Sequence, residues 1–236
     1  MTALQGKEIW EKTDRFDDKK VDNWFKTTLK NGTELGLAFT HEEPITELLK
    51  DHVKSYRDLP FSVFQFQTKF RNETRAKSGI LRTREFLMKD LYSFSKDEEG
   101  HKAFYEKSKV AYTNIFRRAG VGDKTFLTVA SGGSFSTEFS HEYQTETPAG
   151  EDTIYYDKEK NIAINKEVLN DETIKSLGVN KSKLEEKKSI EVGNIYSLGD
   201  FYSKPLGLVY SDEKGEKKPV IMGSYGIGIP RLMGAI

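Results

Sequence analysis

Two neighbouring stretches of the chain alternate between apolar and polar residues, which is the period of a β-strand. Over residues 61–73, one face holds Phe64, Phe66, Thr68 and Phe70, and the other holds Gln65, Gln67, Lys69, Arg71 and Glu73. A polar face of this kind either meets solvent, which is the commoner case, or forms the floor of a polar site. A second strand, over residues 84–94, carries on one face Phe86, Met88, Asp90 and Tyr92, a lining typical of a small-molecule pocket. The basic loop at 74–83 is short, so we expect the two strands to pair as a hairpin with both unusual faces on one side.

A long helix is predicted directly after this hairpin, at about residues 97–119. Ser95 and Glu98 form a capping box at its start. Its expected inner stripe consists of Phe104, Ala111 and Ile115. Gly120 lies where a C-terminal stop is expected.

The rest of the chain predicts shorter elements. Leu48, Leu49 and Val53 have the spacing of a helix over residues 42–54. Short strands are expected near residues 125–130, 138–146, 152–156, 161–166, 189–197 and 219–225. Residues 169–188 are charged and weakly patterned, which indicates a short surface helix or linker. Strand pairs with intervening helices predict an α+β fold built on an antiparallel sheet flanked by helices.

Composition narrows the class of protein. Lysine and arginine together number 37, as do aspartate and glutamate, so any contact with RNA must come from local basic patches. The absence of cysteine excludes disulfides and cysteine-ligated zinc and is compatible with a reducing cytosol. No stretch approaches the roughly 18–20 apolar residues that span a bilayer, and the first ten residues lack the apolar core of a signal peptide. We expect a cytoplasmic protein with no membrane partner.

Three segments carry candidate chemistry: THEE at 40–43, the arginine-rich stretch at 70–94, and GSYGIGIPR at 223–231. The glycine spacing of the third matches neither the dinucleotide fingerprint nor the P-loop, because no Gly-Lys-Ser/Thr follows. By itself it indicates a strand-to-helix turn as readily as a nucleotide site.

Together the three segments resemble the signature motifs of class II aminoacyl-tRNA synthetases, and specifically of prolyl-tRNA synthetases of the bacterial and mitochondrial type. The arginine-rich stretch resembles motif 2, and GSYGIGIPR resembles motif 3. Residues 132–144, 150–152 (GED) and 190–199 (IEVGNIYSLG) are similar to connecting segments of that family, in the family's order. The resemblance implies a class II antiparallel sheet, ATP-dependent activation of L-proline, and transfer of proline to tRNA(Pro).

The resemblance also assigns roles to residues of the nucleotide site. Arg71 would bridge the proline carboxylate and the α-phosphate, and Arg231 would hold the γ-phosphate, which makes these two the catalytic residues. The other implied ATP contacts are Glu73 for the adenine amino group, Arg82 for the outer phosphates, Phe86 for stacking on adenine, Glu191 and Asn194 near the ribose and phosphates, and Gly226 and Gly228 for close backbone approach. Activation of this kind uses Mg²⁺, and Glu191 is the expected carboxylate near the metal; zinc is not expected. The chemistry suits arginine, because its planar fork binds two oxygens and stays charged.

Proline is small and apolar and carries a secondary ammonium, so its site needs an apolar wall and a carboxylate or hydroxyl acceptor. The resemblance assigns to this pocket Thr40, Glu42, Arg71, Asp90, Tyr92 and His141, with Met88 as the wall. Without the motif around it, His141 would more readily be interpreted as a structural histidine.

Several positions depart from the family pattern. Phe39 stands where proline precedes THEE, Ser224 where motif 3 has cysteine, and Asn194 where histidine is common; residues 135–139 include a few extra positions. The chain resembles a catalytic core truncated at both ends, without most of motif 1, which builds the family's homodimer interface, and without an anticodon-binding domain. About 20 residues at 169–188 are too few for the editing domain that relatives carry there. We expect this piece to be poorly active or unstable alone, and unable to clear mischarged alanine.

Two alternatives compete with this interpretation. A threonine-specific class II core of the related type would need a zinc site that includes cysteine, and the chain has none. A non-catalytic paralogue that binds amino acid, tRNA or a regulatory partner would be signalled by loss of Arg71, Glu73 or Arg231, and all three are present.

Overall fold

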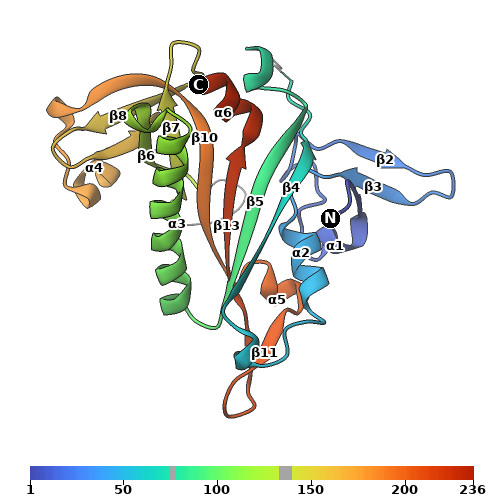
Figure 1. The fold of residues 1–236 in the computed structure, drawn as a ribbon. Helices are drawn as coiled ribbons and strands as arrows, with labels where there is room; N and C mark the ends of the chain where they lie inside the picture. Colours follow the sequence, from blue (N-terminus) through green and yellow to red (C-terminus); the bar gives the residue numbers. More distant parts are fainter. Residues whose placement is uncertain (75–77, 133–139) are drawn as a thin grey trace.

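The computed structural model describes residues 1–74, 78–132 and 140–236, and its centre is an eight-stranded sheet (Figure 1). In order across the sheet the strands are β4 (Phe61–Phe70), β5 (Glu85–Ser95), β13 (Ile221–Gly228), β10 (Glu185–Gly199), β7 (Ser140–Glu146), β6 (Thr125–Ala130), β9 (Ile162–Asn165) and β8 (Asp152–Asp157). Neighbouring strands are antiparallel except β6 and β9, which are parallel. Strand β8 also pairs with the first half of β10, so the last five strands of this order close on themselves.

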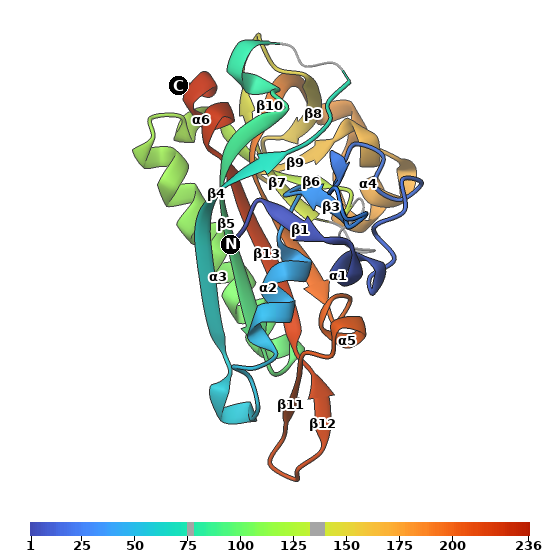
Figure 2. The same cartoon turned by 90° about the vertical axis from the view of Figure 1, so that its right-hand side faces the viewer.

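Helix α3 (Glu98–Arg118) covers one face of the sheet, against β5, β13 and β10 (Figure 2). Its N-cap is Asp97, whose side chain accepts a hydrogen bond from the Gly100 amide at 2.8 Å, and its end is followed by Gly120 with a φ of 85°. The buried stripe consists of His101, Tyr105, Ser108, Tyr112 and Phe116. The predicted cap at Ser95 is therefore wrong. Of the predicted stripe, Ala111 and Ile115 are exposed, whereas Phe104 is half-buried and packs against the core. The helix turns its tyrosines inward because large aromatic rings bury more apolar area than alanine does.

The N-terminal segments and short helices cover the face of the sheet opposite α3. The N-terminal elements are β1 (Leu4–Gly6), α1 (Lys7–Glu11), β2 (Lys26–Thr28) and β3 (Glu34–Leu37), with α2 (Glu42–Leu49) following them. The strands form a small sheet in the order β1-β3-β2, beside a core cluster of Trp10, Val21, Trp24 and Phe39. Later in the chain come α5 (Ser203–Leu206) and the pair β11 (Val209–Ser211) and β12 (Lys217–Pro219). Ile45 and Leu49 of α2 pack with Phe94 and Met222 of the sheet, which places α2 on this face.

Helix α2 is shorter than predicted. The expected helix over 42–54 ends at Leu49, and Val53 is buried beyond its end. Leu48, which was expected on the inner face, is 52% exposed. The buried face instead follows positions 42, 45, 46 and 49, because residues three and four apart share one side of a helix.

Strands β4 and β5 form the predicted hairpin, in which Gln65 lies opposite Asp90 and Lys69 opposite Phe86. The polar face of β4 is directed toward the pocket side of the sheet, and the Lys69 side chain is only 1% exposed. The apolar face is the open one: Phe64 is 66% exposed and Phe66 is 61% exposed. The solvated alternative for the polar face is therefore wrong. The apolar face of β4 is exposed because α3 lies over β5 and β13 and does not cover this edge strand.

The other predicted strands are confirmed: β6 has the predicted ends, and the rest have shifted ends. The prediction at 138–146 corresponds to β7, which begins at Ser140, and its first two residues lie outside the described part of the chain. The segment at 169–188 contains α4 (Asp171–Leu177), capped by Asn170 and closed by Gly178 with a φ of 62°, and then enters β10. The chain ends in α6 (Ile229–Ala235), directly after β13. None of the helices in the described ranges is long and apolar enough to cross a bilayer.

Candidate active site

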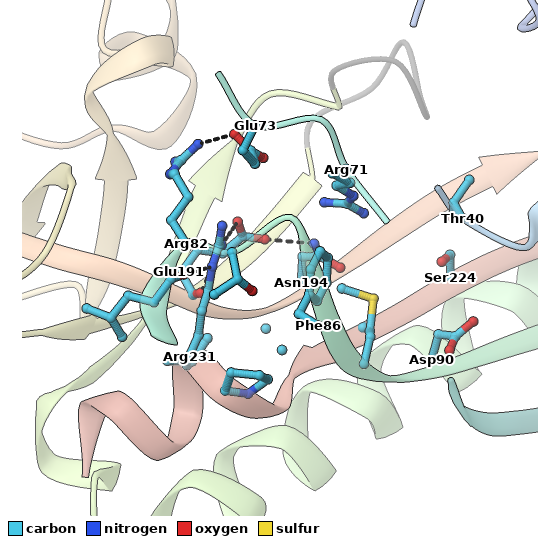
Figure 3. Close-up of a pocket in the computed structure, with 18 of the residues that line it drawn as sticks. Thr40, Arg71, Glu73, Arg82, Phe86, Asp90, Glu191, Asn194, Ser224 and Arg231 are labelled. Carbon is cyan, nitrogen blue, oxygen red and sulfur yellow. Dashed lines mark hydrogen bonds and ion pairs between the residues drawn. The ribbon is translucent and has the colours of Figure 1, made fainter. Parts of the chain in front are cut away.

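A pocket opens on the sheet face opposite α3, across β5, β13 and β10 (Figure 3). Alternate residues of β5 and β13 line it, because successive side chains of a strand lie on opposite faces. Strand β10 instead contributes consecutive residues from Glu191 to Asn194, where its register shifts, and then Tyr196. The lining residues are Phe86, Met88, Asp90 and Tyr92 of β5, Ser224, Gly226 and Gly228 of β13, and Glu191, Asn194 and Tyr196 of β10. The pocket holds about 940 Å³ of empty space, a figure that includes open solvent at its mouth.

The centre of the pocket floor is a row of cross-strand neighbours, Asp90, Gly226 and Asn194. A Cβ atom at Gly226 would lie 2.9 Å from Oδ1 of Asn194, so only glycine leaves both that amide and the floor undisturbed. At Gly228 the nearest atom to a Cβ would be 3.6 Å away, on Arg231, which is an ordinary contact. A side chain at 226 would therefore displace the Asn194 amide, whereas position 228 has room for one.

Arg71 follows β4 and lies between two aromatic rings. Its guanidinium carbon is 4.8 Å from the centre of the Phe39 ring and 5.3 Å from the centre of the Phe86 ring. Its Nε atom is buried and has no hydrogen-bond partner within the described ranges. Burial, and then the charge of Arg231, lower the pKa of Arg71, but a guanidinium still stays protonated at neutral pH. The rings hold the cation in place while part of its hydrogen-bonding capacity is unused.

Arg231 enters the same pocket from the first turn of α6. Its Nη1 donates to Oε2 of Glu191 at 3.0 Å, and its Nε donates to the Leu81 carbonyl oxygen at 3.1 Å. Asn194 Nδ2 donates to the other carboxylate oxygen of Glu191 at 2.7 Å. Arg71 and Arg231 thus share one hollow, although they lie far apart in the chain.

A third arginine, Arg82, lies at the mouth between two carboxylates. Its Nη1 donates to Oε2 of Glu73 at 2.9 Å, and its Nε donates to Glu151 at 2.5 Å. Glu151 belongs to the GED segment and received no role from the sequence. Glu73 thus neutralises Arg82, so an anionic ligand would have to compete with it for the same guanidinium.

The opposite end of the pocket is rich in hydrogen-bond acceptors. Glu42 accepts at Oε1 from the Ser224 hydroxyl at 3.1 Å and at Oε2 from the Thr40 hydroxyl. Tyr92 donates to Oδ2 of Asp90 at 2.6 Å. Next to Glu42, Glu43 is fully buried and paired with Arg15 at 2.8 Å, which fixes the start of α2. The carboxylates of Glu42 and Asp90 therefore both line this end of the pocket, an arrangement that suits a ligand cation.

His141 is the one predicted site residue that the structure does not bring into the pocket. Its Nδ1 bonds the Tyr105 hydroxyl at 2.9 Å, on the α3 side of the sheet. Burial and then Lys109 lower the pKa of His141 to about 4, so the ring is neutral at pH 7. Along β7 the next residue, Glu142, faces the other way, and alternation alone could not tell which of the two meets the pocket. The extra positions expected at 135–139 lie outside the described residues.

Glu142 belongs to an acidic group beside the pocket. Its Oε2 accepts from Gln144 Nε2 at 2.8 Å and from Asn165 Nδ2 at 3.0 Å. Burial, and then the charge of Glu191, raise the pKa of Glu142 to about 8. In the described part of the chain, no group of three or more histidine, aspartate or glutamate side chains is arranged to hold a metal ion.

A family model described as "tRNA synthetase class II core domain (G, H, P, S and T)" matches residues 25–236, which include every pocket residue named above. The chain belongs to this family. The predicted α+β fold with an antiparallel sheet flanked by helices is confirmed as the class II core fold.

The class II core resembles proteins named Proline–tRNA ligase. It is 37% identical over 249 residues to that of Anaplasma marginale (strain St. Maries) and 36% identical over 253 residues to that of Rickettsia rickettsii (strain Sheila Smith). Each alignment covers 100% of this chain and 58% of the relative, so the chain spans little more than half the length of these proteins.

Two solved structures share the class II fold over the whole chain. Prolyl-tRNA synthetase from Cryptosporidium parvum, complexed with L-proline and AMP, superposes with a TM-score of 0.71 at 14% identity, and the match covers 40% of it. The Giardia lamblia prolyl-tRNA synthetase in complex with prolyl-adenylate gives 0.74 at 17% identity and 41% coverage. At these identities the likeness shows the fold alone.

Proposed function

We propose that the protein carrying this class II core is a cytoplasmic proline–tRNA ligase. It would activate L-proline with ATP to prolyl-adenylate and pass the prolyl group to tRNA(Pro). The observation that carries the proposal is one pocket in which Arg71 lies between an acceptor-rich end, with Glu42 and Asp90, and an end that holds Arg82 and Arg231. The names of the curated relatives support proline as the amino acid, and the solved relatives were captured with proline, AMP or prolyl-adenylate.

In the proposed reaction a carboxylate oxygen of proline attacks the α-phosphorus of ATP. A new O–P bond forms as the bond to pyrophosphate breaks, and pyrophosphate leaves with the electron pair. No side chain forms a covalent bond or carries a proton, so positioning and neutralisation of charge supply the rate. Arg71 would bridge the carboxylate and the α-phosphate with its planar fork, and Arg231 would hold the γ-phosphate.

The remaining nucleotide contacts are those that the family resemblance implies, and the residues concerned line the pocket. Phe86 would stack on adenine, Glu73 would accept from the adenine amino group, and Arg82 would approach the outer phosphates. Because Arg82 pairs with Glu73 and Arg231 pairs with Glu191, ATP would exchange these internal ion pairs for contacts with phosphate. We assign Gly226, and with it Gly228 and Asn194, to the floor beneath the nucleotide.

Magnesium fits this site as an ion held mainly by phosphate oxygens and water. Of the described residues, none forms a group of three metal-ligating side chains, and Glu191 is the carboxylate that lines the pocket beside Arg231. Mg²⁺ usually takes only one or two carboxylates from the protein. When bound, it would neutralise charge on the phosphates; Glu191 would be its protein ligand, and we include no zinc.

At the amino-acid end, Thr40, Glu42, Asp90 and Tyr92 would surround the secondary ammonium, and Met88 would form the apolar wall. Four of these five residues have acceptor oxygens, which is what a small cationic group needs. We leave His141 out of the proposed pocket because it bonds Tyr105 on the opposite face.

A homodimer is part of the proposal. Phe64 and Phe66 on β4 and Leu87 on β5, at 66%, 61% and 41% exposure, form an open apolar strip on the α3 side of the hairpin. Contiguous exposed apolar side chains of this kind mark interaction surfaces. A second copy of the class II protein is the proposed partner.

The test is ATP–pyrophosphate exchange by the complete gene product, with each proteinogenic amino acid in turn. Proline should be the amino acid that supports exchange, and Arg71→Ala should abolish it. Exchange that depends on another amino acid would refute the specificity. Binding of ATP and proline without exchange would favour a non-catalytic paralogue.

A further inference from the structure

Lys69 is a buried lysine next to the amino-acid end of the pocket. Its side chain is 1% exposed, and its Nζ lies 2.8 Å from Oδ2 of Asp90. The described residues that line the pocket do not include Lys69, so it acts on the pocket through Asp90. Burying an ammonium is costly unless partners compensate for the lost hydration. Burial lowers the pKa of Lys69, and the neighbouring charge of Asp90 opposes that change.

The two oxygens of Asp90 have different surroundings. Oδ2 accepts three hydrogen bonds: from Lys69 Nζ at 2.8 Å, from Gln65 Nε2 at 2.8 Å and from the Tyr92 hydroxyl at 2.6 Å. Oδ1 is buried and has no hydrogen-bond partner in the described part of the chain. Asp90 lines the pocket, and its Oδ1 lacks a donor from the described residues.

Each oxygen of Glu42, the other carboxylate at this end, already accepts one hydrogen bond and can accept another. Its Oε1 accepts from Ser224 and its Oε2 accepts from Thr40. Oδ1 of Asp90 is therefore the carboxylate oxygen at this end that lacks a donor from the described residues. A secondary ammonium can supply that donor.

The His41 ring is a second neighbour of the Lys69 ammonium. Burial, and then the charge of Lys69, lower the pKa of His41 to about 4, so the ring is neutral at pH 7. An ammonium can only donate, so His41 Nδ1 accepts from Lys69, and Nε2 carries the proton and donates to the Thr2 carbonyl oxygen at 3.2 Å. The lysine is thus fixed between the N-terminal segment and the sheet.

We propose that Lys69 is a positioning residue of the ammonium subsite, which holds Asp90 through Oδ2 so that Oδ1 accepts a hydrogen bond from the secondary ammonium of the bound amino acid. The inference rests on the proposed function and deepens it, because it names the atom that recognises the ligand cation. It predicts that Lys69 affects binding of proline and leaves binding of ATP unchanged.

The first experiment compares Lys69→Met with Lys89→Met in the complete gene product. Lys89 is the matched control: it lies on β5 of the same hairpin but faces α3, where its Nζ bonds the Tyr112 hydroxyl and the Tyr225 carbonyl oxygen, each at 3.1 Å. In pyrophosphate exchange, Lys69→Met should raise KM for proline about 10- to 100-fold and change KM for ATP less than about threefold. Lys89→Met should leave both values within about threefold. A proline KM that stays within threefold in Lys69→Met, or an equal rise for ATP, would overturn the proposal.

Loss of Lys69 also leaves the buried Asp90 carboxylate without its cation, which destabilises the fold. The second comparison therefore uses two variants, Asp90→Asn and the double variant Lys69→Met/Asp90→Asn. The double variant lacks both the Lys69 cation and the Asp90 anion. If Lys69 acts through Asp90, the two variants should share one proline KM within about twofold. If the double variant instead raises the proline KM by the product of the two single effects, Lys69 acts by another route and the inference is wrong.

A ligand analogue separates recognition of the cation from recognition of the ring. Tetrahydro-2-furoic acid keeps the ring and carboxylate of proline and replaces the ammonium with an ether oxygen. The preference is the ratio of the affinity for proline to the affinity for this competitor. Lys69→Met should lower this ratio about tenfold or more, and an unchanged ratio would count against the inference. Wild-type protein without proline-dependent exchange would instead refute the proposed function, whatever the Lys69 variants do.

Discussion

Phe39 should affect catalysis without touching a ligand, through its stacking on Arg71. The Arg71 guanidinium lies 4.8 Å from the Phe39 ring and 5.3 Å from the Phe86 ring, so Phe39→Leu removes one of two aromatic supports. A cation over a ring is worth about 0.5–1 kcal/mol when exposed and about 2 when desolvated, and Arg71 is partly buried. We therefore take about 1–2 kcal/mol as the loss. At 1.36 kcal/mol per factor of ten, kcat/KM for proline activation should fall about 5- to 30-fold.

The matched control for Phe39→Leu is Trp24→Leu. Trp24 belongs to the same core cluster as Phe39, but its ring packs on Phe16 and Lys26. Both variants should lower the melting temperature, because both shrink the same cluster. Exchange kinetics are compared at a temperature where circular dichroism shows both variants folded. The reasoning fails if Phe39→Leu keeps the wild-type kcat/KM, or if Trp24→Leu loses as much.

Three further predictions concern groups beside the site. The pKa of Glu142 is raised from 4.5 to about 8 in the folded state, so its contribution to stability is complete below pH 4.5 and is lost as the pH rises toward 8. Urea unfolding should find Glu142→Gln about 2–4 kcal/mol more stable than wild type at pH 8.5 and equal to it near pH 4.5; the same gain at both pH values would contradict this. Arg15→Met should cost about 3–5 kcal/mol of unfolding free energy, because it leaves Glu43 buried without its cation, and adding Glu43→Gln should restore part of the loss. His141→Phe should lower the melting temperature but keep KM for proline within about twofold, and a tenfold rise in KM would return His141 to the pocket.

Local patterns predicted the hairpin that carries the site, because alternation is a property of the extended backbone and needs no partner. They also grouped Phe86, Met88, Asp90 and Tyr92 on one face, and these four line the pocket. The same reasoning failed on α3, where a stripe of alanine and isoleucine was chosen over tyrosines. Tyrosine is a polar residue in such patterns, yet its ring is large enough to decide which side of a helix is buried.

Other features depended on contacts that no local pattern contains. Lys69 looked like one more polar residue on a strand, and its burial follows from Asp90 across the hairpin and His41 from the N-terminal side. His141 and Glu142 were known to face opposite ways, but only the position of α3 settled which one lies against Tyr105. The sequence marked Phe39 only as a departure from the family pattern, and the structure shows that its ring lies against Arg71.

By itself, the sequence determined the family of the chain, the paired strands and the residues available for chemistry, because motifs and alternation are short-range properties. Only the tertiary structure decided which face of each strand is covered, and it brought Arg71 and Arg231 into one pocket. The physical reason is that a side chain's burial depends on what packs against it, and here those partners come from segments far away in the chain.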